Sequence, residues 1–247
     1  MGYRCLYYWE MTNLDLALRD LAYSLGADLF GVADLSIARE FIGRQGGEHI
    51  SRFPRALSVG FRLLDPVVNE LHQHDNISAI YGYRALYNSV NANLDRIALL
   101  LAKKIQELGF KAYPIPPSQT IDNNRLEGII SHKLAANLAG LGWIGKSCLL
   151  ITPKWGPRVR LTTVLTDAPL KTGTPLANLC DDCRQCVEIC PAKAITGIPW
   201  NPSEPRDVRF KAWLCKEYVD RRTSKMGEGI CGLCVYICPY GRATGTH

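Results

Sequence analysis

The sequence has no uncharged stretch that approaches the ~20 residues needed to span a bilayer. Residues 1–13 contain Arg4 and Glu10 and have no apolar block followed by a small-residue cleavage site, so no secretory signal is expected. Internal repeats are also missing, apart from two related cysteine runs. These absences predict a cytoplasmic protein that makes no use of a membrane.

The sequence also lacks an extreme hydrophobic fraction, charged fraction or net charge. Hydrophobic residues make up 47% of the 247 residues and charged residues 21%, which excludes wholesale disorder and allows a sizeable core. The formal net charge of +6 predicts only a mild attraction to anions. Charge alone therefore gives no strong reason to expect a nucleic-acid partner.

Cysteine, in contrast, is abundant. Cys5 and Cys148 stand alone, whereas the other eight of the ten cysteines lie between Cys180 and Cys238. A disulfide scaffold would need an oxidising compartment and usually a shorter chain. The eight clustered thiols are therefore predicted to be metal ligands.

Cys180, Cys183, Cys186 and Cys190 have the spacing of a bacterial ferredoxin run, C-x2-C-x2-C-x3-C-P, whose fourth cysteine serves the other cluster. A second run ends in Cys231-x2-Cys234-x3-Cys238-Pro239, and Cys215 stands in for its missing member. Gaps of two residues place successive thiolates around one cube-shaped [4Fe–4S] cluster. A gap of three residues places the next thiolate about one helical turn further along the chain, near a neighbouring site. The spacing predicts one [4Fe–4S] cluster on Cys180, Cys183, Cys186 and Cys238, and a second on Cys190, Cys215, Cys231 and Cys234. The alternative is two zinc sites of four cysteines each, although zinc ribbons lack the C-x3-C-P endings.

Strand and helix patterns alternate before the cysteines. Helices are predicted over 14–25, 89–108 and 134–141, and extended segments over 28–33, 56–61, 111–114, 148–152 and 160–165. A loop at 169–175 then marks a boundary. We expect an α/β or α+β sheet domain over 1–170 and a double-cluster module over 171–247. Two neighbouring clusters would form an electron relay, which needs a donor and an acceptor.

The stretch Ala139-Gly-Leu-Gly-Trp-Ile-Gly-Lys146, with Leu149-Leu-Ile151 and Leu165-Thr-Asp-Ala-Pro-Leu170, resembles epoxyqueuosine reductases. That family is similar in its core to reductive dehalogenases. The resemblance implies an α+β fold, with a nitroreductase-like α/β sheet domain that binds cobalamin and a C-terminal ferredoxin-like double [4Fe–4S] module. It also implies that cobalt cycles between Co(II) and Co(I), and that a nearby acid supplies a proton.

The sequence departs from the family pattern in three ways. The Asp-x-x-Pro-x-x-Glu motif that carries the family's acid is replaced, since its Asp falls on Leu126 and its Glu on His132. The helical-repeat part that holds tRNA in many members is absent, and so is the twin-arginine signal of respiratory dehalogenases. We therefore interpret the chain as a short, divergent relative whose substrate need not be tRNA.

Three residues are predicted to replace the lost acid. His132 is the first, because a histidine side chain can donate a proton, although it can equally be a histidine bonded to a backbone carbonyl. Glu127 is the next possibility, with a solvated loop carboxylate as its alternative. Tyr87 is the third, because dehalogenases use a tyrosine beside a basic residue as the proton donor.

The glycine-rich stretch resembles part of a corrinoid cradle. The predicted cofactor-binding residues are Gly140, Gly142, Trp143, Gly145, Lys146 and Ser147. The resemblance implies that Lys146 and Ser147 hydrogen-bond the amide or phosphate groups of cobalamin. Trp143 could lie in the protein core or in the wall of the corrinoid site.

These features predict an iron–sulfur oxidoreductase, with cobalamin as a further cofactor, that acts on a small-molecule substrate. Its electron donor would be a ferredoxin or flavodoxin, which the basic segment 206–225 could dock. The alternative is an electron-transfer protein that reduces a partner, such as a corrinoid protein. A large apolar pocket over 140–147 would favour the enzyme, and a filled core there would favour the carrier.

Overall fold

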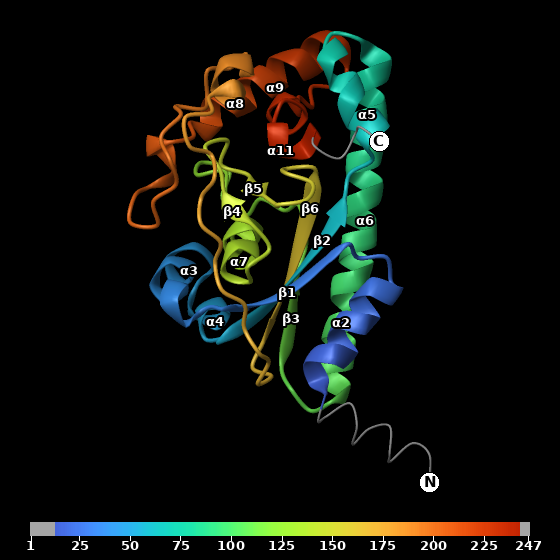
Figure 1. Cartoon of the computed structure of the whole chain (residues 1–247), viewed down its shortest axis with the longest axis vertical. Coiled ribbons are helices and arrows are strands. Elements are labelled where there is room, and N and C mark those ends of the chain that lie inside the picture. The colour runs from blue at the N-terminus through green and yellow to red at the C-terminus, as the bar shows by residue number, and fades with distance from the viewer. Residues whose placement is uncertain (1–12, 243–247) are drawn as a thin grey trace. The chain divides into compact units, whose positions relative to one another are not determined.

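The computed structural model describes residues 13–242 (Figure 1). Within that range, no helix combines the length and the apolarity that crossing a bilayer requires. The elements in chain order are α2 (Leu14–Ser24), β1 (Leu29–Asp34), η1 (Ser36–Ala38), α3 (Arg39–Gly46), α4 (Glu48–Ser51), β2 (Arg55–Arg62), α5 (Asp65–Asn69), η2 (Glu70–Gln73), α6 (Ile77–Glu107), β3 (Ala112–Ile115), α7 (His132–Leu138), β4 (Trp143–Ile144), β5 (Leu150–Ile151), β6 (Val159–Thr166), α8 (Gln185–Ile189), η3 (Arg206–Val208), α9 (Ala212–Met226), α10 (Leu233–Tyr236) and α11 (Pro239–Arg242).

The described chain divides into two compact units, each built from three stretches. The first, here called the sheet unit, contains residues 13–61, 91–141 and 161–175. The second, here called the cysteine unit, contains residues 62–90, 142–160 and 176–242. Two stretches from the first two thirds of the sequence therefore fold together with the C-terminal cysteines.

The sheet has four strands in the order β1-β2-β6-β3. β1 pairs antiparallel with β2, and β3 pairs antiparallel with β6. The inner strands β2 and β6 are buried along most of their length, as expected for strands covered on both faces. Antiparallel pairs combined with intervening helices make the architecture α+β, as the sequence predicted.

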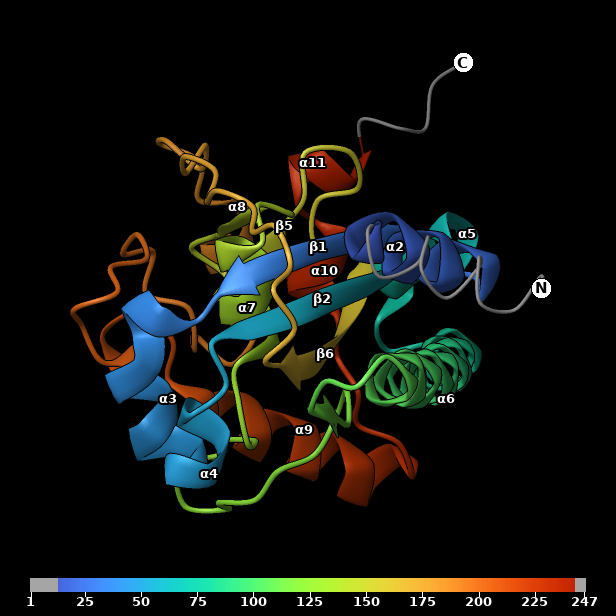
Figure 2. The ribbon, with the colours of Figure 1, turned by 90° about the horizontal axis from the view of Figure 1, so that it is seen from below.

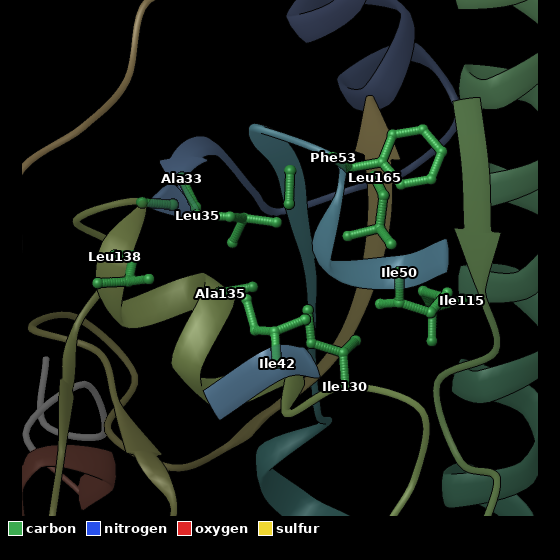
Figure 3. Packing of buried hydrophobic residues seen from close by; sticks show 12 residues of the cluster. Ala33, Leu35, Ile42, Ile50, Phe53, Ile115, Ile130, Ala135, Leu138 and Leu165 are labelled. Atoms are coloured by element: carbon green, nitrogen blue, oxygen red, sulfur yellow. The ribbon is translucent and has the colours of Figure 1, made fainter. Parts of the chain in front are cut away.

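The core of the sheet unit lies between the strands and the short helices α3, α4 and α7. Figure 3 shows Ile42 near Ala135, and the side chains of Ile42, Ile50 and Ala135 are all fully buried. Helix α7 packs on β1, and α2 packs on the same strand (Figure 2). A Cβ atom on Gly31 would lie 3.0 Å from the carbonyl oxygen of Ala139, so this glycine permits the close approach of α7.

Several predicted elements lie within a few residues of their observed positions, but α6 does not. It begins at Ile77 rather than at residue 89, so Tyr81, Tyr83 and Tyr87 lie inside the helix rather than before it. Tyrosine and glycine are poor helix formers, which hid this part of the helix from the sequence pattern. Burial of Ile80 and Tyr83 outweighs that low propensity.

Candidate functional site

The first cysteine run is a turn followed by a short helix. The N–H of Cys183 donates to the carbonyl of Cys180 at 2.9 Å, which brings the two thiols to one side of the loop. Cys186 then lies in α8, and Cys190 follows the last residue of that helix in an extended conformation. Helix α8 therefore separates the third thiol of the run from the fourth.

The second run repeats this arrangement. Cys231 precedes Gly232, whose left-handed φ of 75° starts α10, and Cys234 lies within that helix. Cys238 follows one helical turn later, between α10 and α11. The missing member of this run is Cys215, on α9. Figure 1 shows α8, α9 and α11 at the same end as the β4–β5 hairpin.

The thiols gather in two groups. Burial raises the pKa of Cys186 to about 11, helped by the neighbouring thiols of Cys180 and Cys183, and it raises the pKa of Cys238 to about 11, helped by Cys180 and Cys186. In the other group, burial and then the thiols of Cys231 and Cys190 raise the pKa of Cys215 to about 11.

Cys234 joins the second group. Burial raises its pKa, followed by the thiols of Cys231, Cys215 and Cys190, and last by that of Cys186. By these neighbours, Cys180, Cys183, Cys186 and Cys238 form one group and Cys190, Cys215, Cys231 and Cys234 form the other, and which thiols bind which cluster stays a prediction. Each short helix, α8 and α10, carries a thiol of one group and leads to a thiol of the other.

A cavity adjoins the first group. It has about 370 Å³ of space between atoms, partly open to solvent, and its lining includes Cys180, Cys183, Cys186 and Cys238. Within residues 13–242, no three His, Cys, Asp or Glu side chains lie close enough to share a single metal ion. Four thiols lining one cavity are the donor set that a [4Fe–4S] cluster takes, with one thiolate on each iron.

The three glycines predicted to contact cobalamin instead pack against other segments of the protein. In the sheet unit, Gly140 has a φ of 77°, and a Cβ there would lie 2.7 Å from the carbonyl oxygen of Thr174. In the cysteine unit, a Cβ on Gly142 would lie 2.2 Å from the carbonyl oxygen of Ile151, and one on Gly145 would lie 2.7 Å from the Ile151 side chain. Close packing therefore accounts for all three glycines.

The other residues of that stretch lie against the first cysteine run. Trp143 is buried, with its ring edge-on to Tyr240 at a centroid distance of 4.8 Å. The buried Lys146 donates from Nζ to the carbonyls of Asp181 and Cys183, and Ser147 lines the same cavity as the thiols.

A tyrosine–arginine pair lies beside the second thiol group. Tyr83 is buried, its ring packs on Gly232, and the thiols of Cys231 and Cys234 are among its neighbours. One helical turn later on α6, Tyr87 accepts a hydrogen bond at its hydroxyl from Nη2 of Arg160 at 2.9 Å. The Arg160 guanidinium also lies 4.1 Å from the centre of the Tyr87 ring.

Sequence reasoning named Tyr87 but missed Arg160. The signal that could have found it is a single charged residue in the strand Val159–Thr166. An arginine placed there stabilises any negative charge left on the phenol oxygen after a proton is donated. The pair can therefore act as a proton donor with a built-in counter-charge.

An ion pair between Arg84 and Glu228 holds the loop before Cys231. Arg84 donates to both carboxylate oxygens of Glu228, at 2.7 and 2.6 Å, and the same carboxylate accepts N–H bonds from Gly229 and Ile230. The Arg84 guanidinium lies 5.7 Å from the Tyr87 ring centre. This pair therefore connects the helix of Tyr87 to the loop that carries the second thiol group.

Replacing Glu228 with glutamine should lower the free energy of unfolding at pH 7 by about 1–3 kcal/mol, since the side chain is only 15% exposed. The Arg84 hydrogen bond holds the pKa of Glu228 down to about 2 from 4.5. A lowered pKa stabilises the fold above the unfolded-state value, and that contribution is lost as the pH falls from about 4.5 to 2. Denaturant unfolding at pH 7 measures the effect.

The matched control is Glu40→Gln, because Glu40 also pairs with an arginine, Arg44, but its side chain is 87% exposed. That change should cost no more than about 0.5 kcal/mol. Equal losses for the two variants would show that the Arg84–Glu228 pair has no special role.

The other two predicted acids lie in the sheet unit. His132 begins α7, and its ring nitrogens lie 2.8 Å from the Thr163 hydroxyl and 2.9 Å from the carbonyl of Pro116. A carbonyl only accepts, so Nε2 donates to Pro116; in the neutral ring, Nδ1 then accepts from the threonine hydroxyl. Glu127 closes a turn and pairs with Arg125 at 3.4 Å. Both arrangements resemble the structural alternatives considered for these residues, and their catalytic roles stay predictions.

Cys148 is not among the neighbours of either thiol group; it is buried and has a left-handed φ of 60°. Cys5 lies outside the described residues.

Comparison with known proteins bears first on the cysteines. Residues 179–241 match a family described as a 4Fe-4S double cluster binding domain. This match lies within the predicted module and agrees with two thiol groups of four. Residues 179–241 therefore form a double [4Fe–4S] cluster-binding domain.

Two curated relatives extend the likeness beyond the cysteines. Epoxyqueuosine reductase of Listeria monocytogenes is 32% identical over 123 residues, which cover 49% of this chain and 32% of the relative. Tetrachloroethene reductive dehalogenase of Sulfurospirillum multivorans is 34% identical over 110 residues, 41% of this chain and 22% of the relative. The chain is a divergent relative of epoxyqueuosine reductases. It spans less than half the length of these curated relatives.

Solved structures show the fold that the chain shares with this group. A reductive dehalogenase, described as suggesting a mechanism for B12-dependent dehalogenation, matches with a TM-score of 0.70 and 22% identity over 92% of this chain and 32% of its own. Epoxyqueuosine reductase with an epoxyqueuosine-modified tRNA-Tyr stem loop matches with a TM-score of 0.56 and 17% identity over 96% of this chain and 68% of its own. Both support the fold class predicted from the resemblance.

Proposed function

We propose that this chain is a reductase in which two [4Fe–4S] clusters supply electrons, a corrinoid accepts them, and Tyr87 supplies a proton. The observation that carries the proposal is the Tyr87–Arg160 pair beside the second thiol group. An electron relay by itself has no use for a phenol held against a cation. A reductase that adds a hydrogen to carbon needs both electrons and a positioned proton donor.

The chain would hold its clusters by the two thiol groups, which supply one-electron reduction when loaded. We propose that electrons enter at the first group, since its cavity is partly open to solvent. They would leave at the second group, which lies next to Tyr83 and hence to Tyr87. In functional terms the relay would occupy residues 171–247, and the acceptor would be bound by residues 1–170.

The proposal that the acceptor is a corrinoid is supported by the sequence resemblance and by the solved reductive dehalogenase described as suggesting a mechanism for B12-dependent dehalogenation. When bound, it supplies a strongly reducing cobalt that can break a carbon–halogen or carbon–oxygen bond. Of the residues predicted to hold it, Lys146 is engaged with the first cysteine run and Gly142 and Gly145 face Ile151. We therefore assign no residue of this chain to the corrinoid.

The proposed substrate is a small organohalide or epoxide. Replacing a carbon–halogen bond with carbon–hydrogen consumes two electrons and one proton and releases halide. Reducing an epoxide to an alkene consumes two electrons and two protons and releases water, so a second proton would come from solvent. Tyr87 would give the first proton, and Arg160 would hold the resulting phenolate until solvent protonates it again. The electron donor would be a ferredoxin or flavodoxin, and the epoxyqueuosine-modified tRNA that a relative binds is the other substrate to test.

The experiment uses protein purified without oxygen, reduced with titanium(III) citrate and mixed with cob(II)alamin. We expect a changed cob(II)alamin EPR spectrum, and bromide release from 3-bromo-4-hydroxybenzoic acid or reduction of an epoxyqueuosine-modified stem loop. An unchanged spectrum with no turnover of either probe would contradict the proposal.

The alternative is an electron carrier that reduces a partner protein. The observation in its favour is that Gly142 and Gly145 are packed against Ile151 and that Trp143 is buried. Clusters that reduce and reoxidise normally, in a chain that leaves cobalamin and both probes unchanged, would support the carrier.

A further inference from the structure

The contacts of Lys146 indicate a role different from the corrinoid contact that the sequence predicts. We propose that Lys146 is a positioning residue for the first iron–sulfur cluster, fixing the loop between Cys180 and Cys186 and placing a positive charge beside the cluster. This inference rests on the proposed two-cluster function.

The ammonium group of Lys146 is buried without an opposite charge. The side chain is only 7% exposed, which is rare for a lysine unless it is paired. In the described part of the chain, its Nζ donates to two backbone carbonyls, those of Asp181 and Cys183, and to no carboxylate. A buried ammonium is costly without a counter-charge.

The missing counter-charge is available at the same place. Lys146 lines the cavity together with Cys180, Cys183, Cys186 and Cys238. A [4Fe–4S] core bound by four thiolates carries a net charge of about −2 in its resting state. The loaded cluster would therefore neutralise Lys146, and Lys146 would lower the cost of placing a dianion in a partly buried cavity.

The loop that Lys146 binds turns at Asp181. Asp181 has a left-handed φ of 35°, a region that aspartate tolerates better than most residues other than glycine. Its carbonyl is one of the two that accept from Lys146. The hydrogen bonds of Lys146 therefore hold the chain at the turn just after the first thiol.

Other contacts fasten the same loop to the stretch around Lys146. Asn178 donates to the carbonyl of Ile144 at 3.3 Å and accepts from the N–H of Cys180 at 2.9 Å. Tyr240, whose ring packs on Trp143, donates to the carbonyl of Leu179 at 2.9 Å. The stretch 143–146 therefore serves as a platform for the first cysteine run, and Lys146 is its one cation.

The charge has a predictable effect on electron transfer. Reduction adds a negative charge to the cluster, so a nearby cation stabilises the reduced state more than the oxidised state. Lys146 should therefore raise the potential of the first cluster.

The test compares Lys146→Gln with Lys146→Arg, using redox titrations followed by EPR together with iron analysis. Glutamine keeps a hydrogen-bond donor and loses the charge, whereas arginine keeps the charge. We expect Lys146→Gln to lower the midpoint potential of one cluster by at least about 59 mV, which is a tenfold change in the equilibrium constant of a one-electron reduction. The other cluster should be unchanged, and Lys146→Arg should stay near the parent protein.

Lys193→Gln is the matched control, because Lys193 is exposed and lies three residues after Cys190. Solvent screens its charge, so its loss should leave both potentials unchanged. Loss of the first cluster in Lys146→Gln, with retention in Lys146→Arg, would also support the proposal. Unchanged potentials in Lys146→Gln with full iron would overturn it, as would an altered cob(II)alamin spectrum with unchanged clusters. A parent protein without clusters would instead overturn the proposed function.

Discussion

Replacing Cys215 with alanine should lower the iron content from about eight to about four atoms per chain and remove one of the two EPR signals of the reduced protein. Cys215 is far in sequence from either compact run, yet its thiol neighbours are Cys190 and Cys231. Each iron of a cubane takes one thiolate, so the loss of this ligand leaves the second cluster incomplete.

The interleaving of the two runs can be tested in the same way. Cys238 belongs to the second run by sequence but to the first thiol group by position. Alanine at Cys238 or at Cys180 should therefore remove the same EPR signal, and alanine at Cys215 should remove the other. Cys148→Ala is the control, because Cys148 is buried and belongs to neither group. Full iron in Cys215→Ala, or iron loss in Cys148→Ala, would contradict the assignment.

Replacing Tyr87 with phenylalanine should reduce turnover by about 10²-fold or more while both clusters keep their iron and their potentials. The ring remains for the Arg160 guanidinium, which lies 4.1 Å from its centre, and only the hydroxyl is removed. The loss should therefore report the proton and not the packing. Bromide release from 3-bromo-4-hydroxybenzoic acid, or reduction of the epoxyqueuosine-modified stem loop, measures it.

Tyr81→Phe is the control for this substitution. Tyr81 lies on the same helix, two residues before Tyr83, and is 51% exposed. It should keep the turnover of the parent protein. Full activity in Tyr87→Phe would remove Tyr87 as the proton donor and return attention to His132 and Glu127.

The sequence predicts the two compact cysteine runs because their spacing is local. A two-residue gap makes a turn, as between Cys180 and Cys183, and a three-residue gap makes about one helical turn, as between Cys186 and Cys190 in α8. These constraints operate within a few residues and need no knowledge of the fold. The double-cluster domain matched at 179–241 agrees with them.

The sequence could not predict how distant residues meet. Arg160 and Tyr87 are 73 positions apart, and Arg84 and Glu228 are 144 apart. Nothing in the local pattern links them, since each pair depends on how α6 packs in the cysteine unit. The same reason hid the true start of α6, because burial of Tyr83 overrides the weak propensity of its sequence.

His132 and Lys146 show the converse difficulty, where a residue's chemistry suggests more than its contacts support. The imidazole of His132 suggested an acid, but both ring nitrogens are used in hydrogen bonds to Thr163 and Pro116. Lys146 suggested a phosphate or amide contact, but its ammonium binds the first cysteine run. In both cases the partners come from segments whose position the sequence does not define.

The most direct test of this account is the iron and acid-labile sulfide content of the parent protein purified without oxygen. The account predicts about eight of each per chain, arranged as two clusters that reduce separately. A colourless protein without iron, or one with about two zinc atoms in place of iron, would contradict it.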